Sequence, residues 1–145
     1  MTVREIILSK PRFRKKNSVV VRKLTQDTAK IKVRMWDQSI VYAVIVPEPT
    51  EDLLSAQIAE GYDAENVPVQ AEHFASGTTD DSGLIDLTFT LLSDSTNYTV
   101  FFTAECVLPY EPRIRIEDDE VRQVNFKTRK NLNLMNAEEN VVEEL

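Results

Sequence analysis

Two stretches of the chain alternate between apolar and polar side chains over most of their length, and this period of two is the strongest constraint on its fold. In residues 84–91 and 97–107, every second residue is apolar, and successive side chains of a β-strand point to opposite faces. The pattern therefore predicts two strands with one buried face each. The residues predicted to face inward are Ile85, Leu87 and Phe89 in the first stretch, and Tyr98, Val100, Phe102 and Ala104 in the second.

Further stretches carry weaker versions of the same signal. Residues 31–35 alternate between apolar and basic side chains, whereas residues 39–46 are apolar throughout after the first, as in a central strand covered on both sides. We also expect strands at residues 19–21 and 121–128, an edge strand at 67–74 and a turn at 77–83.

One short helix is expected between the strands. Thr50 can cap its N-terminus, Glu51 and Asp52 fall in its first turn, and Gly61 follows its end. Many strands at short spacing with a single helix over about residues 50–60 predict an all-β antiparallel sandwich.

Length and composition fit one domain without cross-links. The chain has 145 residues, 42% of them hydrophobic, and its single cysteine, Cys106, rules out a disulfide framework. No run approaches the roughly 18 apolar residues of a membrane span, and the first residues do not form a signal peptide. We predict a basic linker, or a strand from a preceding repeat, at 1–17, the sandwich at 18–128, and an acidic tail or linker at 129–145.

The net charge of −7 is distributed unevenly along the chain. Residues 1–34 contain eleven Lys and Arg against two acids, whereas residues 35–112 contain no Lys or Arg. We therefore expect a molecule whose positive and negative charges are separated, with one basic end and one acidic end. A basic segment with an aromatic residue could contact nucleic acid, but the acidic remainder would repel phosphate, so we expect a solvated linker or a contact surface for an acidic partner. This segment contains Arg12, Phe13, Arg14, Lys15 and Lys16.

The turn before the second alternating stretch resembles the tyrosine corner of fibronectin type III domains. In that family a leucine, a threonine four positions later and a tyrosine two further mark the entry into a central strand, and here these residues are Leu92, Thr96 and Tyr98. The resemblance implies that the tyrosine ring is buried while its hydroxyl meets a backbone group upstream. The family's proline and glycine at this turn are replaced by Asp94 and Ser95. These residues can also form a turn, because their side chains hydrogen-bond to the backbone.

The chain is more closely similar to the divergent type III-like repeats found in tandem in large surface proteins of bacteria and single-celled eukaryotes. Their valine- and tyrosine-rich strand, proline and short helix correspond to residues 41–44, Pro49 and residues 55–61, and the similarity covers about residues 18–128. It implies a non-catalytic structural or adhesive module whose partners are neighbouring copies or modules. Residues 3–17 also loosely repeat residues 121–131, as expected for a tandem array, although so short a similarity can arise by chance.

Residues that could support catalysis or metal binding are few. His73 is the only histidine and has no cysteine cluster beside it, so neither a zinc site nor a catalytic triad can be assembled, and we expect no cofactor and no enzymatic activity. Loop acids could bind calcium if they converge, although solvated loop acids are the simpler interpretation. These acids are Asp80, Asp81, Glu117, Asp118, Asp119 and Glu120.

Two residues of the second alternating stretch are candidates for surface roles. Asn97 begins a formal glycosylation sequon and should face solvent if Tyr98 faces inward. Phe101 falls on the outward face, where it is either covered by the C-terminal tail or available to a partner.

These observations leave three classes of function open. The first is a structural or adhesive module of a cell-surface or extracellular protein, arranged in tandem or in a filament, with protein partners and neither nucleic acid nor membrane insertion. The second is an intracellular sandwich domain of an adaptor or cytoskeleton-associated protein. The third, a carbohydrate-binding or hydrolytic domain, has the least support in the sequence.

Overall fold

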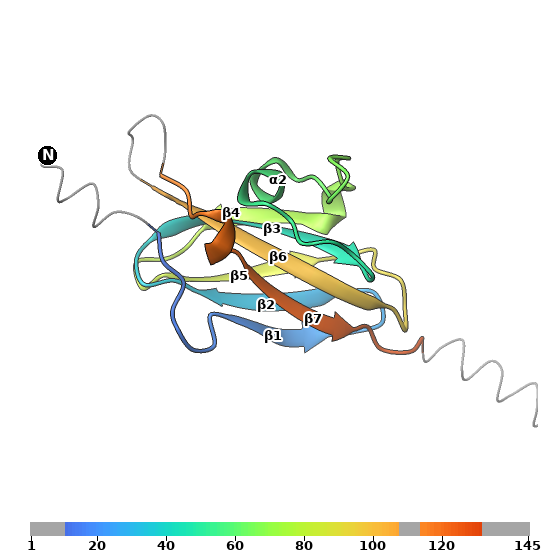
Figure 1. Cartoon of the computed structure of the whole chain (residues 1–145). Coiled ribbons are helices and arrows are strands. Elements are labelled where there is room, and N and C mark those ends of the chain that lie inside the picture. The colour runs from blue at the N-terminus through green and yellow to red at the C-terminus, as the bar shows by residue number, and fades with distance from the viewer. Residues whose placement is uncertain (1–10, 108–113, 132–145) are drawn as a thin grey trace, which may run out of the picture.

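The computed structural model describes residues 11–107 and 114–131 and is a sandwich of two antiparallel sheets (Figure 1). One sheet has the order β1-β2-β5 and the other the order β4-β3-β6-β7. Together with the short helix α2 (Ser55–Glu60) they confirm the predicted all-β fold. The strands are β1 (Val19–Leu24), β2 (Ala29–Arg34), β3 (Ser39–Pro47), β4 (Phe74–Thr78), β5 (Leu84–Phe89), β6 (Asn97–Cys106) and β7 (Arg122–Lys127).

The main core lies between the two sheets. The strand register places the apolar residues of β2 opposite those of β5, so that Ile31 pairs with Leu87 and Ala29 with Phe89. The inward row of β6 meets them from the second sheet, as its alternation predicted. The fully buried members of this core include Ala29, Ile31, Val33, Met35, Val41, Ala43, Ile45, Phe89, Val100, Phe102 and Ala104.

A second, smaller core lies on the outer face of the four-stranded sheet, under α2. Ile58 of the helix and Leu53 before it pack on Val44, Val46 and Phe101. A hydrogen bond of 2.5 Å between the buried hydroxyls of Ser55 and Thr103 joins the helix to β6. The sheet is therefore covered on both sides along β3 and β6, which explains the continuous apolar run in β3.

The helix is shorter than predicted, and Thr50 does not cap it. The Thr50 hydroxyl donates to the carbonyl of Glu51, and helical geometry begins only at Ser55. The amide of Leu54 donates to the side chain of Gln57, three residues later, and this bond stabilises the first turn. The predicted end is correct, because Gly61 has a φ of +77° and closes the helix.

The edge strand lies further along the chain than predicted. Residues 67–70 are not a strand, and a 3₁₀ turn, η1 (Ala71–His73), precedes β4, which includes Gly77. Phe74 sets the start of β4, because it pairs with Val44 of β3 and stacks on Tyr42 with ring centroids 6.4 Å apart. Tertiary packing thus overrides the local pattern here.

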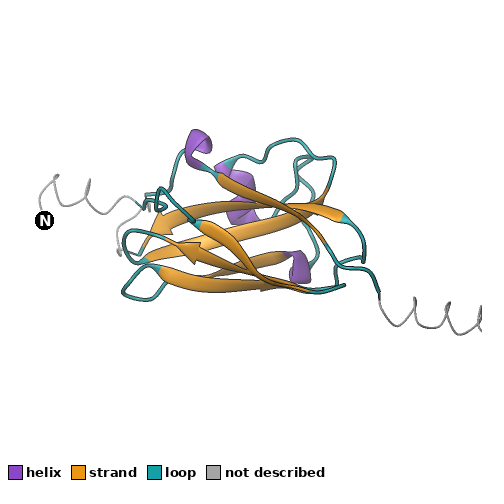
Figure 2. Ribbon diagram, turned by 90° about the horizontal axis from the view of Figure 1, so that it is seen from below, coloured by secondary structure: helices purple, strands orange, loops and turns teal. Residues whose placement is uncertain are grey.

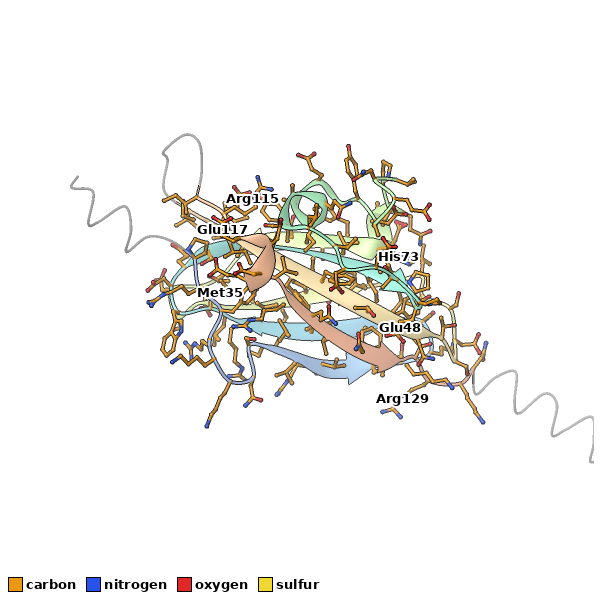
Figure 3. The ribbon with its side chains drawn as sticks, in the orientation of Figure 1. Met35, Glu48, His73, Arg115, Glu117 and Arg129 are labelled. Atoms are coloured by element: carbon orange, nitrogen blue, oxygen red, sulfur yellow. The ribbon has the colours of Figure 1, made fainter. Side chains whose placement is uncertain are left out.

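The chain enters and leaves the sandwich at opposite ends. The first described residues lie at one end, next to the turn that follows β2, and residues 129–131 lie at the other (Figures 1 and 2). The same two ends are marked in Figure 3 by Met35 and Glu117 on one side and Glu48 and Arg129 on the other.

Candidate functional site

Tyr98 anchors the loop between β5 and β6. Its side chain is 3% exposed, and its hydroxyl accepts a hydrogen bond of 2.8 Å from the amide of Ser93. Leu92 is buried in the main core, and the Thr96 hydroxyl donates to the carbonyl of Asp94. All three residues of the predicted corner thus contribute to the scaffold and present no binding group to solvent.

Thr128, which follows the end of β7, completes this corner, and nothing in the sequence pattern identified it. Its hydroxyl donates to the carbonyl of Ser93 at 2.6 Å and accepts from the amide of Thr96 at 2.9 Å. His73 lies on the same corner, with its ring edge-on to Tyr98 and its Nε2 atom 3.2 Å from the carbonyl oxygen of Leu91. The histidine therefore has a packing role here.

Phe101 is not available as a contact surface in the folded chain. Its side chain is 1% exposed because α2 and the segment before it cover this part of β6. The strand alternation correctly placed it on the outer face, but a layer of the same chain lies over that face.

Phe13 is also buried, which corrects its prediction as a contact residue. It is 6% exposed, forms a bridge with Met35 and belongs to the main core. The amide of Arg14 donates to the carbonyl of Arg34, and the amide of Trp36 donates to the carbonyl of Arg12. This segment therefore pairs with the residues at the end of β2, on the N-terminal side of the boundary predicted after residue 17.

The basic residues around Phe13 differ in their availability. The guanidinium of Arg14 donates to the carbonyls of Met35 and Ser82 and lies 5.7 Å from the centre of the Trp36 ring. The side chains of Arg12, Lys15 and Lys16 are exposed.

The calcium candidates do not form a metal site. Asp80 accepts hydrogen bonds from the amides of Ser82 and Leu84, and Asp118 accepts one from the amide of Ser55. Over residues 11–107 and 114–131, no three or more His, Cys, Asp or Glu side chains are placed to hold a metal ion together. Asp80 and Asp118 instead stabilise a turn and the start of α2.

A polar groove of about 460 Å³ runs between the segment that follows β3 and the outer face of β6 and β7. Asn97, the residue of the sequon, is exposed in it, and the hydroxyl of Thr99 donates to Glu48 at 3.0 Å. The groove has two carboxylates and three amides but no cation in its lining, so it suits a cationic or polyhydroxylated group. Its lining consists of Glu48, Pro49, Thr50, Asp52, Asn97, Thr99, Phe101, Gln123 and Asn125.

The outer face of the β1-β2-β5 sheet is basic. Lys30 pairs with Lys23 across the strands, and Lys32 lies two residues further along the same face, opposite Asp86. Their neighbours in β2 are fully buried on the other face, so these lysines point away from the core.

The opposite face of the sandwich is acidic. Residues 48–72, which run from the end of β3 through α2 to η1 and cover the outer face of the four-stranded sheet, contain seven Asp and Glu and no Lys or Arg. The 3₁₀ turn η2 (Asp118–Glu120) adds three acids beside them, joined to α2 through Asp118. Within the described residues, charge is thus divided between the two faces of the sandwich. The acidic tail on which the predicted end-to-end polarity depends lies outside the described residues.

No model of a known protein family matches the chain, and no curated protein is significantly similar to it in sequence. In the described part of the chain, no helix has the length and apolar character needed to cross a membrane.

Proposed function

We propose that this chain is a non-catalytic structural or adhesive module of a cell-surface or extracellular protein, of the fibronectin type III-like kind. In this proposal the sandwich holds neighbouring protein modules at a fixed spacing and presents its charged faces to them. The module recognises protein partners, and copies of itself or similar modules are the first candidates.

The observation that carries this proposal is the path of the chain through the sandwich. The described chain begins at one end and finishes at the opposite end, with residues 12–14 bound to the end of β2 and Arg129 bound to the turn between β1 and β2. Arg129 donates from its amide to the carbonyl of Thr25 and from its side chain to that of Leu24. Modules with this path can be joined in a line, because the entry and exit of each one lie at opposite ends.

The corner around Tyr98 and the strand order support the assignment to this kind of sandwich. Two facing antiparallel sheets, with a buried tyrosine at the start of a strand, fit the sandwich and the corner that the sequence resemblance implies. Because the fold alone does not determine a function, the proposal rests on the charged faces and the chain path as well.

Immunolabelling of cells that express the protein tests its location and partners together. An antibody against residues 11–131 is applied to intact and to permeabilised cells, and the intact cells are treated in parallel with a membrane-impermeant, amine-reactive cross-linker. Labelling of intact cells and cross-links to copies or similar modules are expected. Labelling only after permeabilisation would replace the surface role with the intracellular adaptor, and the recovery of uncross-linked protein alone would contradict a structural role.

A further inference from the structure

We propose that copies of this chain stack face to face, with the basic outer face of the β1-β2-β5 sheet of one copy docked on the acidic layer of the next. The basic face consists of Lys23, Lys30, Lys32 and Arg34, and the acidic layer consists of residues 48–72 with η2. This inference rests on the proposed function in one respect, namely that copies of the chain are partners of each other.

The basic face holds like charges close together, with a single acid among the residues of its three strands. Lys30 lies directly opposite Lys23, and like charges in this position of an antiparallel pair destabilise the sheet. Asp86 is the only acid of β5 on this face, and it lies opposite Lys32. A second molecule that brings carboxylates to this face would relieve the repulsion.

The acidic layer is the complementary surface on the same molecule. The acids of residues 48–72 occur in a stretch of the chain that contains no Lys or Arg, so these acids lack neutralisation from their neighbours in sequence. At about 0.1 M salt the screening length is about 10 Å, and two surfaces in contact then attract each other while charges on the far side of either molecule have little effect. The net charge of −7 consequently does not prevent the two faces from binding.

The polar groove gives this contact a specific receptor. It is open to solvent beside the acidic layer, and its lining contributes the carboxylates of Glu48 and Asp52 together with the amide oxygens of Asn97, Gln123 and Asn125. Glu48 uses Oε1 to accept the Thr99 hydroxyl, and no hydrogen bond in the described structure uses its Oε2. A lysine ammonium from the basic face of another copy needs oxygen acceptors of this kind.

The position of the two surfaces determines the type of assembly. They lie on opposite faces of one sandwich, so each copy can use both at once, and the contact is heterologous. A contact of this kind adds copies one after another and does not close into a symmetric dimer. The expected product is therefore an open stack that grows with concentration.

Sedimentation velocity of the full chain at about 50 mM and about 300 mM salt tests this arrangement. We expect self-association at low salt, at a protein concentration on the order of 100 μM, that disappears at high salt. K30E/K32E reverses the basic face and should weaken association at least about tenfold. K15E/K16E makes the same change in net charge on exposed lysines outside the three-stranded sheet and should associate like the unchanged protein.

A charge exchange between the two surfaces makes the test specific. E51K/D52K reverses the charge of two exposed residues of the acidic layer, and Asp52 also lines the groove. Each double variant alone should associate at least about tenfold more weakly than the unchanged protein. An equimolar mixture of K30E/K32E and E51K/D52K should regain association, because the unchanged basic face of E51K/D52K meets the unchanged acidic layer of K30E/K32E and the two reversed surfaces are also complementary. Circular dichroism and thermal melting of both variants confirm that the fold is retained.

Three results would overturn the stacking model. They are a monomeric protein at low salt, equal weakening by K15E/K16E, and no recovery in the mixture. If any of these occurs while cross-linking on intact cells still captures other proteins, the module retains its structural role with a different partner. The two proposals can therefore fail separately.

Discussion

The hydroxyl oxygen of Tyr98 lies 2.8 Å from the amide nitrogen of Ser93 and accepts its hydrogen bond. Through this bond the start of β6 holds the loop that leads into the strand, while the tyrosine ring fills the core between the sheets. Thr128, at the end of β7, hydrogen-bonds to both Ser93 and Thr96 and so connects the loop to the last strand. The corner therefore joins β5, β6 and β7 at one end of the sandwich.

Substitution of Tyr98 by phenylalanine should lower the free energy of unfolding by about 1 to 3 kcal/mol. The ring stays buried, but the amide of Ser93 loses its acceptor. Urea denaturation measures the change. Tyr62→Phe is the matched control, because Tyr62 is half-buried and its hydroxyl has no hydrogen bond within the described residues. Equal stability of the unchanged protein and Tyr98→Phe would mean that this bond does not stabilise the fold.

Much of the sandwich could be predicted because several of its strands place a row of apolar side chains in the core between the sheets. The inward rows of β2, β5 and β6 follow directly from a period of two, and Tyr98 falls into phase with them. The positive φ of Gly61 after α2 was likewise predictable from residue type. These features depend on residues that are close in sequence.

The features that could not be predicted depend on contacts between distant segments. Phe101 has an outward position in β6 and is buried only because α2 lies over it. Phe13 stands in a run of basic residues, and only its pairing with Met35 places it in the core. The division of charge between the two faces also required the strand register, because a linear charge count does not show which lysines share a face.

Loss of the Phe101 ring should destabilise the chain strongly. The ring is 1% exposed between β6 and the helical layer, so Phe101→Ala should cost about 3 to 5 kcal/mol of unfolding free energy. Phe101→Leu keeps most of the volume and should cost about 1 kcal/mol, which keeps the test informative if the alanine variant does not fold. Val67→Ala, at a side chain that is 51% exposed, should change stability by less than about 0.5 kcal/mol in the same denaturation series.

Phe13 provides a test of where the folded unit begins. Phe13→Ala should lower the unfolding free energy by about 3 kcal/mol, because it leaves a cavity beside Met35 and removes the aromatic contact with the Arg122 guanidinium. Arg12→Ala, which keeps the backbone hydrogen bond to Trp36 and changes only an exposed side chain, is the control. If both variants unfolded at the same urea concentration as the unchanged protein, residues 12–14 would be a linker after all.

Two glycines in neighbouring parts of the structure should respond differently to alanine. Gly83 is buried with a φ of +81°, and a Cβ atom there would collide with the carbonyl oxygen of Met35, whose amide donates to the carbonyl of Gly83 at 2.7 Å. Backbone strain and the collision together should cost Gly83→Ala about 3 kcal/mol or more.

At Gly77 the backbone conformation is open to any residue, and the added Cβ would meet only the flexible end of Ile85, at 2.7 Å. Gly77→Ala should therefore cost less than about 1 kcal/mol, since the Ile85 side chain can move aside. Thermal melting of the two variants under the same conditions gives the comparison. A smaller loss at Gly83 than at Gly77 would show that the turn before β5 can rearrange, and that its link to Met35 does not fix this end of the sandwich.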